Sequence, residues 1–89
     1  MRRLVFEQGA YDDFCDWGIY DRQRFLKIHD LLKAILREPF RGVGKPEALK
    51  GRLRGCWSRR IDDTHRLVYR ITAEGDVEIL SCKGHYGDK

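Results

Sequence analysis

The sequence contains no C-x-x-C pair and no apolar run long enough to cross a bilayer. Its three cysteines, Cys15, Cys56 and Cys82, are an odd number spread along the chain, which argues against a disulfide framework and against a zinc site. The segment from Met1 to Glu7 lacks the apolar core of a signal peptide. We therefore expect a cytoplasmic protein with reduced cysteines, no membrane partner, no metal and no cofactor.

Proline is also scarce, and both prolines, Pro39 and Pro46, bracket one segment that contains Gly42 and Gly44. This segment is predicted to be a loop within the fold, because patterned segments lie on both sides of it. The 89 residues suffice for one domain, 1–89, and 18 basic against 14 acidic residues are typical of a folded globular chain. A net charge of +4 is too small to identify a nucleic-acid partner by itself.

Before the loop, the spacing of apolar residues predicts a strand over residues 2–6 and two helices. The first helix is expected over about residues 10–19. Asp21 is a suitable N-cap for the second, which must end by Glu38 because Pro39 disfavours helical geometry in the residue before it. Steps of three and four residues give this second helix one apolar stripe, formed by Phe25, Ile28, Leu31, Leu32, Ile35 and Leu36.

After the loop, three strands are predicted over residues 56–61, 65–72 and 77–82, with a short extra strand near Ala48 and Leu49. Short turns make consecutive strands antiparallel. The expected fold class is therefore α+β, with two N-terminal helices packed on a mostly antiparallel sheet of four to five strands. Alternation places Cys82 on the same face as Leu80, and both Cys82 and Tyr69 are expected in the core, although a bulge would invert the alternation.

Basic residues concentrate in the loop and the sheet, with few acids among them. They are Lys45, Lys50, Arg52, Arg54, Arg59, Arg60, Arg66, Arg70 and Lys83. A sheet face that gathers several of them would suit a phosphate backbone, and Trp57, Tyr86 and His85 could stack on bases. The alternative is that the arginines are scattered and that Trp57 belongs to the core.

RNA carries its own nucleophile, the 2′-hydroxyl, so a ribonuclease needs a base, an acid and a cation for the charge on phosphorus. Glu47 lies between basic residues and His85 follows the last strand, so the pair could act as base and acid. Spacing alone does not select them, since such a pair occurs in many proteins. For the other histidines, His29 and His65, surface and packing roles are expected.

Several short motifs, in order and in register, resemble those of the YoeB/Txe toxins of the RelE-like superfamily. The segment Gly44–Lys50, G-K-P-E-A-L-K, resembles the family's G-K-P-E-P-L-K. Trp57–Ile61 and His65–Tyr69 match its W-S-R-R-I and H-R-L-V-Y, and His85-Tyr86 matches its closing H-Y. The resemblance covers nearly the whole chain. It departs at Gly84, where the family usually has an aromatic residue.

The resemblance implies a RelE-like fold and a type II toxin, a metal-independent endoribonuclease that cleaves mRNA at the ribosome and inhibits translation. It implies Glu47 as general base, His85 as general acid and Arg66 as the transition-state stabiliser. It implies phosphate contacts for Lys50 and Arg60 and a role for Tyr86 in positioning the RNA. Arg59 is expected to bind RNA as part of the same basic surface. A YefM/Phd-type antitoxin would be the protein partner, and a homodimer is left open.

Two other functions fit the same composition. A noncatalytic RNA-binding module would keep the basic sheet without cutting, and a protein-interaction subunit would use it only for an acidic partner. The joint presence of Glu47, Arg66 and His85 favours the enzyme.

Overall fold

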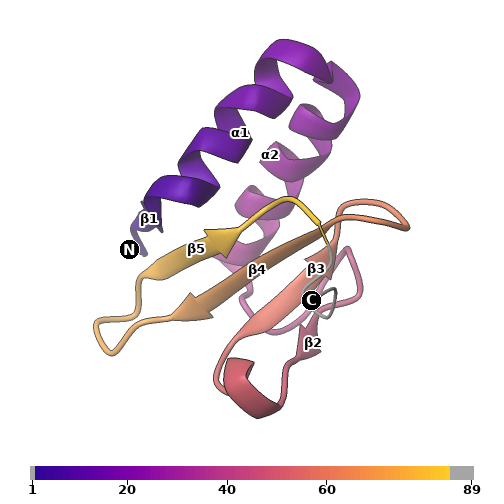
Figure 1. Cartoon of the computed structure of the whole chain (residues 1–89). Helices are drawn as coiled ribbons and strands as arrows, with labels where there is room; N and C mark the ends of the chain where they lie inside the picture. Colours follow the sequence, from indigo (N-terminus) through magenta and orange to yellow (C-terminus); the bar gives the residue numbers. More distant parts are fainter. Residues whose placement is uncertain (1, 85–89) are drawn as a thin grey trace.

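The computed structural model describes residues 2–84 of the chain. Two helices lie side by side over one face of a five-stranded sheet of order β1-β5-β4-β3-β2 (Figure 1). Neighbouring strands are antiparallel except β1 and β5, which are parallel. In chain order the elements are β1 (Leu4–Phe6), α1 (Gln8–Tyr20), α2 (Arg22–Arg37), β2 (Glu47–Ala48), the 3-10 turn η1 (Gly51–Leu53), β3 (Trp57–Arg60), β4 (Arg66–Ile71) and β5 (Val77–Ser81). The predicted α+β class, with its short extra strand, is confirmed.

The two helices begin and end close to the residues predicted for them. The side chain of Asp21 accepts a hydrogen bond from the backbone N–H of Arg24 at 3.2 Å, which confirms it as the N-cap of α2. Glu38, before Pro39, is already extended. Gly18 lets the helices approach closely, because a Cβ there would lie 3.2 Å from the ring of Phe25. No helix within residues 2–84 is long and apolar enough to span a membrane.

The main core lies between the helices and the sheet. The apolar stripe of α2 packs there against β4 and β5, and Tyr69 and Cys82 are fully buried, as predicted. Burial, together with the charge of Asp13, raises the pKa of the Cys82 thiol to about 12, so the thiol stays protonated. A second, smaller cluster of Leu49, Cys56 and Val68 lies apart from this core.

A bulge in β5 changes the predicted alternation. Tyr69 pairs with Ile79, but Val68 pairs with Ser81, so Leu80 is an extra residue in the strand. Leu80 packs on the small cluster, whereas Cys82 packs with Ile79 in the main core. The prediction that Leu80 and Cys82 share a face was therefore wrong, because one inserted residue inverts every later side chain.

Arg59 is completely buried on the helix-facing side of β3. Its Nε donates to the hydroxyl of Tyr69 at 3.1 Å, and Nη1 donates to the carbonyl of Val43 at 3.0 Å. Nη2 donates to the carbonyls of Glu38 and Arg41 at 2.7 and 2.9 Å. The guanidinium thus holds the loop after α2 against the sheet. The prediction that Arg59 contacts RNA was wrong, because the side chain points into the core and its donors are occupied.

Close packing completes the attachment of this loop. The amide of Arg60 donates to the carbonyl of Gly44 at 2.7 Å. Gly44 has φ +87°, and a Cβ there would lie 2.7 Å from a methyl of Leu31 and 3.1 Å from the Cβ of Arg59. Only glycine fits this position, because both the backbone conformation and the contact exclude a side chain. The loop therefore reaches β2 along one defined path.

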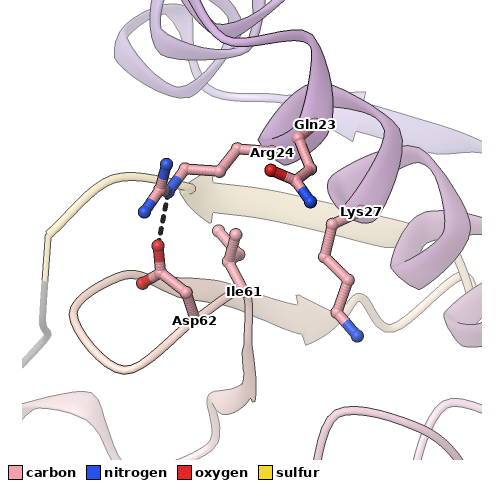
Figure 2. Close-up of a pocket in the computed structure, with 5 residues that line it drawn as sticks. All are labelled: Gln23, Arg24, Lys27, Ile61 and Asp62. Carbon is pink, nitrogen blue, oxygen red and sulfur yellow. Dashed lines mark hydrogen bonds and ion pairs between the residues drawn. The ribbon is translucent and has the colours of Figure 1, made fainter.

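Asp62 connects the β3–β4 turn to α2 beside a pocket of about 390 Å³ (Figure 2). Its Oδ1 accepts from the amides of Thr64 and His65 at 2.8 and 2.6 Å, and its Oδ2 accepts from Nε of Arg24. Arg24 also donates to Asp21 at 2.6 Å. Burial alone would raise the pKa of Asp62. The hydrogen bonds from His65, Arg24 and Thr64 outweigh burial and lower this pKa to about 2.

We expect Arg59→Met to lower the free energy of unfolding by about 3–5 kcal/mol, because three loop carbonyls lose their donor in a buried site. Urea unfolding measures the change. The matched control is Arg60→Met, at the exposed next position of β3, with a change of about 0.5 kcal/mol or less. Equal midpoints for the two variants would contradict this role for Arg59.

The depressed pKa of Asp62 also makes stability depend on pH. The stabilisation is fully present above the unfolded pKa, near 3.8, and is lost as the pH falls toward about 2. Asp62→Asn should therefore cost about 1–2 kcal/mol between pH 5 and 7, a value discounted because Arg24 is partly exposed. The difference from wild type should shrink in urea titrations below about pH 4. A difference independent of pH, or an equal loss in the exposed neighbour variant Asp63→Asn, would refute the assignment.

Candidate active site

The sheet face that points away from the helices collects the predicted catalytic and phosphate-binding residues of β2, β3 and β4. Glu47 pairs with Ser58, and Ser58 pairs with Val68. Two residues along β3, Arg60 pairs with Arg66. Paired residues of neighbouring antiparallel strands point to the same side, so all five side chains share this open face.

Glu47 lies on the edge strand β2 and is exposed. It is the diagonal neighbour of Arg60 across the β2–β3 pair, a relation that typically separates two residues by roughly 7–8 Å. Ser58 and Val68, which are buried, form the floor beside it. The register therefore brings a carboxylate and a guanidinium to the same face, over a small buried floor.

Arg66 is half-buried and its side chain is held by the β3–β4 turn. Its Nη1 donates to the carbonyls of Asp62 and His65, at 2.7 and 3.1 Å. Among the contacts between residues 2–84, none engages its Nε or Nη2. A guanidinium fixed at one nitrogen, with two others directed elsewhere, is suited to a phosphate oxygen pair.

Arg60 and Arg66 are directly opposite each other on this face, and no ion pair within the described range neutralises either of them. Like charges opposite each other on a sheet are destabilising, so an anion between them would relieve repulsion. Lys50 and Lys83 are exposed and add positive charge to the protein surface.

Arg70 differs from these cations because it has a carboxylate partner on β5. Its Nε lies 2.5 Å from Oε1 of Glu78. Hydrogen bonds from Glu7 and from Arg70 lower the pKa of Glu78, which keeps that carboxylate charged. The net positive charge of the open face therefore lies near the β3–β4 turn, where Arg60 and Arg66 lie.

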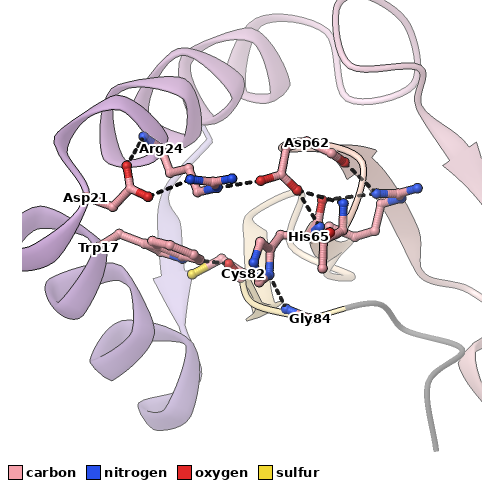
Figure 3. A network of polar contacts seen from close by, with 9 residues as sticks. Trp17, Asp21, Arg24, Asp62, His65, Cys82 and Gly84 are labelled. Carbon is pink, nitrogen blue, oxygen red and sulfur yellow. Dashed lines mark hydrogen bonds and ion pairs between the residues drawn. The ribbon is translucent and has the colours of Figure 1, made fainter.

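Two predicted site residues, His85 and Tyr86, lie outside the described residues. The chain is described up to Gly84, which is tied on both sides to the start of β4 (Figure 3). The carbonyl of Gly84 accepts from the amide of Arg66 at 2.9 Å, and its amide donates to Nδ1 of His65 at 2.8 Å. The residue before His85 is therefore anchored at the backbone of Arg66.

Sequence reasoning assigned His65 a packing role and did not detect this bond. The packing itself is confirmed, since the ring of His65 meets that of Trp17 edge-on at 5.0 Å. His29 is exposed on α2, as expected. Trp57 packs against Phe40 at 4.9 Å between ring centroids and contacts the main core, so the core alternative holds for Trp57.

The pocket beside Asp62 contains none of the predicted catalytic residues. In the part of the chain that the structure describes, no three His, Cys, Asp or Glu side chains form a group that could hold a metal ion. On the described part of the open face, Glu47 is the predicted acid–base residue, and Arg60 and Arg66 lie on the same face.

Comparison with known proteins gives consistent matches over nearly the whole chain. Residues 6–86 match the family model of the YoeB-like toxin of bacterial type II toxin-antitoxin systems. The toxin YoeB of Streptomyces coelicolor is 48% identical over 84 residues, which cover 94% of this chain and 99% of that protein.

Solved structures agree. The YoeB/ParE toxin from Agrobacterium tumefaciens superposes with a TM-score of 0.91 at 42% identity, covering 94% of this chain and 99% of that one. YoeB in the heterotetrameric YoeB-YefM complex from Staphylococcus aureus superposes with a TM-score of 0.87 at 40% identity, covering 97% of this chain and 99% of that one. A YoeB dimer from the same organism gives a TM-score of 0.86 at 41% identity, covering 96% of this chain and 98% of that one.

The fold, the family model and the relatives over nearly full length lead to one assignment: the chain belongs to the YoeB-like toxin family of bacterial type II toxin-antitoxin systems.

Proposed function

We propose that this chain is a metal-independent endoribonuclease that cleaves mRNA in association with the ribosome and thereby inhibits translation. The observation that supports it best is the placement of Glu47 beside the opposed pair Arg60 and Arg66 on one open sheet face. Within residues 2–84 neither arginine has an ion pair with a carboxylate, and a base next to two such cations fits a reaction at a phosphodiester. A cytoplasmic location follows from that substrate.

In the proposed reaction, Glu47 takes the proton of the 2′-hydroxyl, and the resulting oxygen attacks the adjacent phosphorus. Arg66, fixed through Nη1, donates to the phosphoryl oxygens as negative charge develops on them. His85 gives a proton to the departing 5′-oxygen. The products are a 2′,3′-cyclic phosphate and a free 5′-hydroxyl, so the nucleophile comes from RNA and no water is required for cutting.

The remaining cations would position the RNA. Arg60 is exposed opposite Arg66 and would contact a neighbouring phosphate, and Lys50, next to the edge strand, would contact another. Tyr86 would hold the base or sugar beside the cut. Arg59 has no part in this set, since its guanidinium serves the core.

A YefM/Phd-type antitoxin is the proposed protein partner, supported by the complex of the similar S. aureus YoeB with YefM. An acidic segment of such a partner would be attracted to the same cations that bind phosphate. The dimer of the S. aureus toxin supports a homodimer as a further assembly of this chain.

The test of the proposed function uses a substrate that lacks the nucleophile. Once the cut in an mRNA bound to programmed ribosomes has been mapped, the sugar at that position is replaced by 2′-deoxyribose. We expect the substituted mRNA to bind but to remain uncut, and the unsubstituted mRNA to yield a 2′,3′-cyclic phosphate. Efficient cutting of the deoxy substrate would show that water is the nucleophile. Binding without cutting of either substrate would indicate a noncatalytic module.

Glu47→Gln and His85→Gln should each reduce single-turnover cleavage by roughly 10²-fold or more, the usual contribution of a general base or acid. Glutamine keeps the shape of either side chain approximately but cannot accept or deliver the proton. The matched controls are Glu74→Gln in the exposed β4–β5 turn and His29→Gln on the surface of α2, and both should cleave like wild type. A variant of the pair that retains the full rate would remove that residue from the mechanism.

A further inference from the structure

The segment 82–84, which follows β5, is fastened by hydrogen bonds to other parts of the chain. Nε1 of Trp17 donates to the carbonyl of Cys82 at 2.8 Å. The amide of Arg66 donates to the carbonyl of Gly84, and the amide of Gly84 donates to Nδ1 of His65 at 2.8 Å. The last of these uses a side chain as acceptor, at the residue that directly precedes His85. The segment 82–84 is therefore held by α1 and by the start of β4.

His65 is itself held firmly. Its amide donates to Asp62, and its carbonyl accepts from the amides of Ile61 and Asp62 at 3.0 and 3.3 Å. Its ring meets the ring of Trp17 edge-on. Because Nδ1 accepts a hydrogen bond, the ring proton belongs on Nε2, as assigned from this donor.

A continuous chain of polar contacts therefore leads from α2 to the end of the described chain (Figure 3). Asp21 binds Arg24, Arg24 binds Asp62, Asp62 fixes the amide of His65, and the ring of His65 binds Gly84. The acceptor at Nδ1 is thus presented by a rigid support. The peptide that it binds is adjacent to the residue proposed as general acid.

Gly84 makes such support necessary. It has φ +78°, and a Cβ there would meet nothing within 4 Å, so side-chain packing does not fix this position. Glycine is also the residue with the greatest backbone freedom. Hydrogen bonds to both its N–H and its carbonyl restrict that freedom. A reacting group misplaced by about 1 Å can lose about 10² in rate, so the restriction matters for catalysis.

We propose that His65 is a positioning residue for the general acid: its Nδ1 fixes the peptide of Gly84, the residue that directly precedes His85 in the sequence. The inference rests on the proposed function, because it gives His85 the acid role. His65 itself transfers no proton. A purely structural residue would affect folding and cleavage alike, whereas a positioning residue acts on the chemical step through His85.

The hydrogen bond can be tested without any activity. In ¹⁵N-labelled toxin, a scalar coupling across the bond between the Gly84 nitrogen and Nδ1 of His65 should be detectable by NMR. Its absence, in a folded sample in which the Gly84 amide is assigned, would overturn the proposal. Detection of the coupling would support the hydrogen bond between Gly84 and His65, and the variants below then test its effect on cleavage.

Two variants separate the acceptor from the bulk of the side chain. His65→Leu removes the acceptor, and His65→Asn places an amide oxygen close to the position of Nδ1. We expect His65→Leu to lower kcat about 10- to 100-fold with KM within about twofold of wild type, and His65→Asn to recover most of that loss. The control His29→Leu, on the exposed face of α2, should leave both constants unchanged. Equal losses in the leucine and asparagine variants would contradict an acceptor role.

The decisive comparison is His65→Leu in a His85→Gln background, with cleavage measured in single turnover on protein shown to be folded by circular dichroism. If His65 acts through His85, the second substitution should cost no more than about twofold. A further loss as large as in wild type would show a structural role. If His85→Gln alone cleaves at the full rate, the acid assignment fails and the positioning role fails with it. Loss in His85→Gln but not in His65→Leu would reject only the positioning role.

Discussion

The hydrogen bonds of the buried guanidinium of Arg59 are the interaction on which the position of the candidate active site depends. A cation in a core is costly unless every nearby dipole is directed at it. Here a hydroxyl and three backbone carbonyls supply that arrangement, and all three carbonyls come from the segment after α2. The same contacts therefore stabilise the charge and order a loop that has little apolar surface of its own. Strand β2 begins with Glu47 a few residues after this loop. By holding the loop, Arg59 on the helix-facing side of the sheet therefore helps to place the carboxylate of Glu47 on the opposite face.

Much of this fold follows from local patterns in the sequence. The stripe of α2, the N-cap at Asp21, the proline after Glu38 and the short turns between the last three strands each specify an element or its end. The parallel pairing of β1 with β5 is different, since it joins Leu4 to Val77 and no local pattern encodes it. The bulge at Leu80 is also not specified locally, because two consecutive apolar residues, Ile79 and Leu80, fit a regular strand that is buried on both faces as well as a bulged one.

The candidate site was predictable only in part, because local motifs name its residues but long-range pairing places them. Glu47, Arg60 and Arg66 could be named from motifs, but their common face depends on the register of two strand pairs, which the loops determine. Arg59 and Arg60 are adjacent and chemically identical, yet one is buried and the other exposed. Strand alternation turns them to opposite faces, and the carbonyls of the loop after α2 make the inward position suitable for a guanidinium. The acceptor role of His65 was not predicted, because its partner, Gly84, is 19 residues away in the chain and lies beyond the bulge.

The opposed pair Arg60 and Arg66 links stability to binding. Two guanidinium groups facing each other across β3 and β4 repel, and the repulsion is retained because the described structure gives neither a carboxylate partner. Two residues further from the turn along each strand, the buried floor of Ser58 and Val68 excludes water from one side of the face and so weakens screening there. An anion that enters between the arginines removes the repulsion and gains two charge-assisted hydrogen bonds at once. Under the proposed function, RNA phosphate and an acidic antitoxin segment would compete for this gain. The repulsion between Arg60 and Arg66, which lowers the stability of the free toxin, would then favour binding of both the RNA and the antitoxin at the same surface.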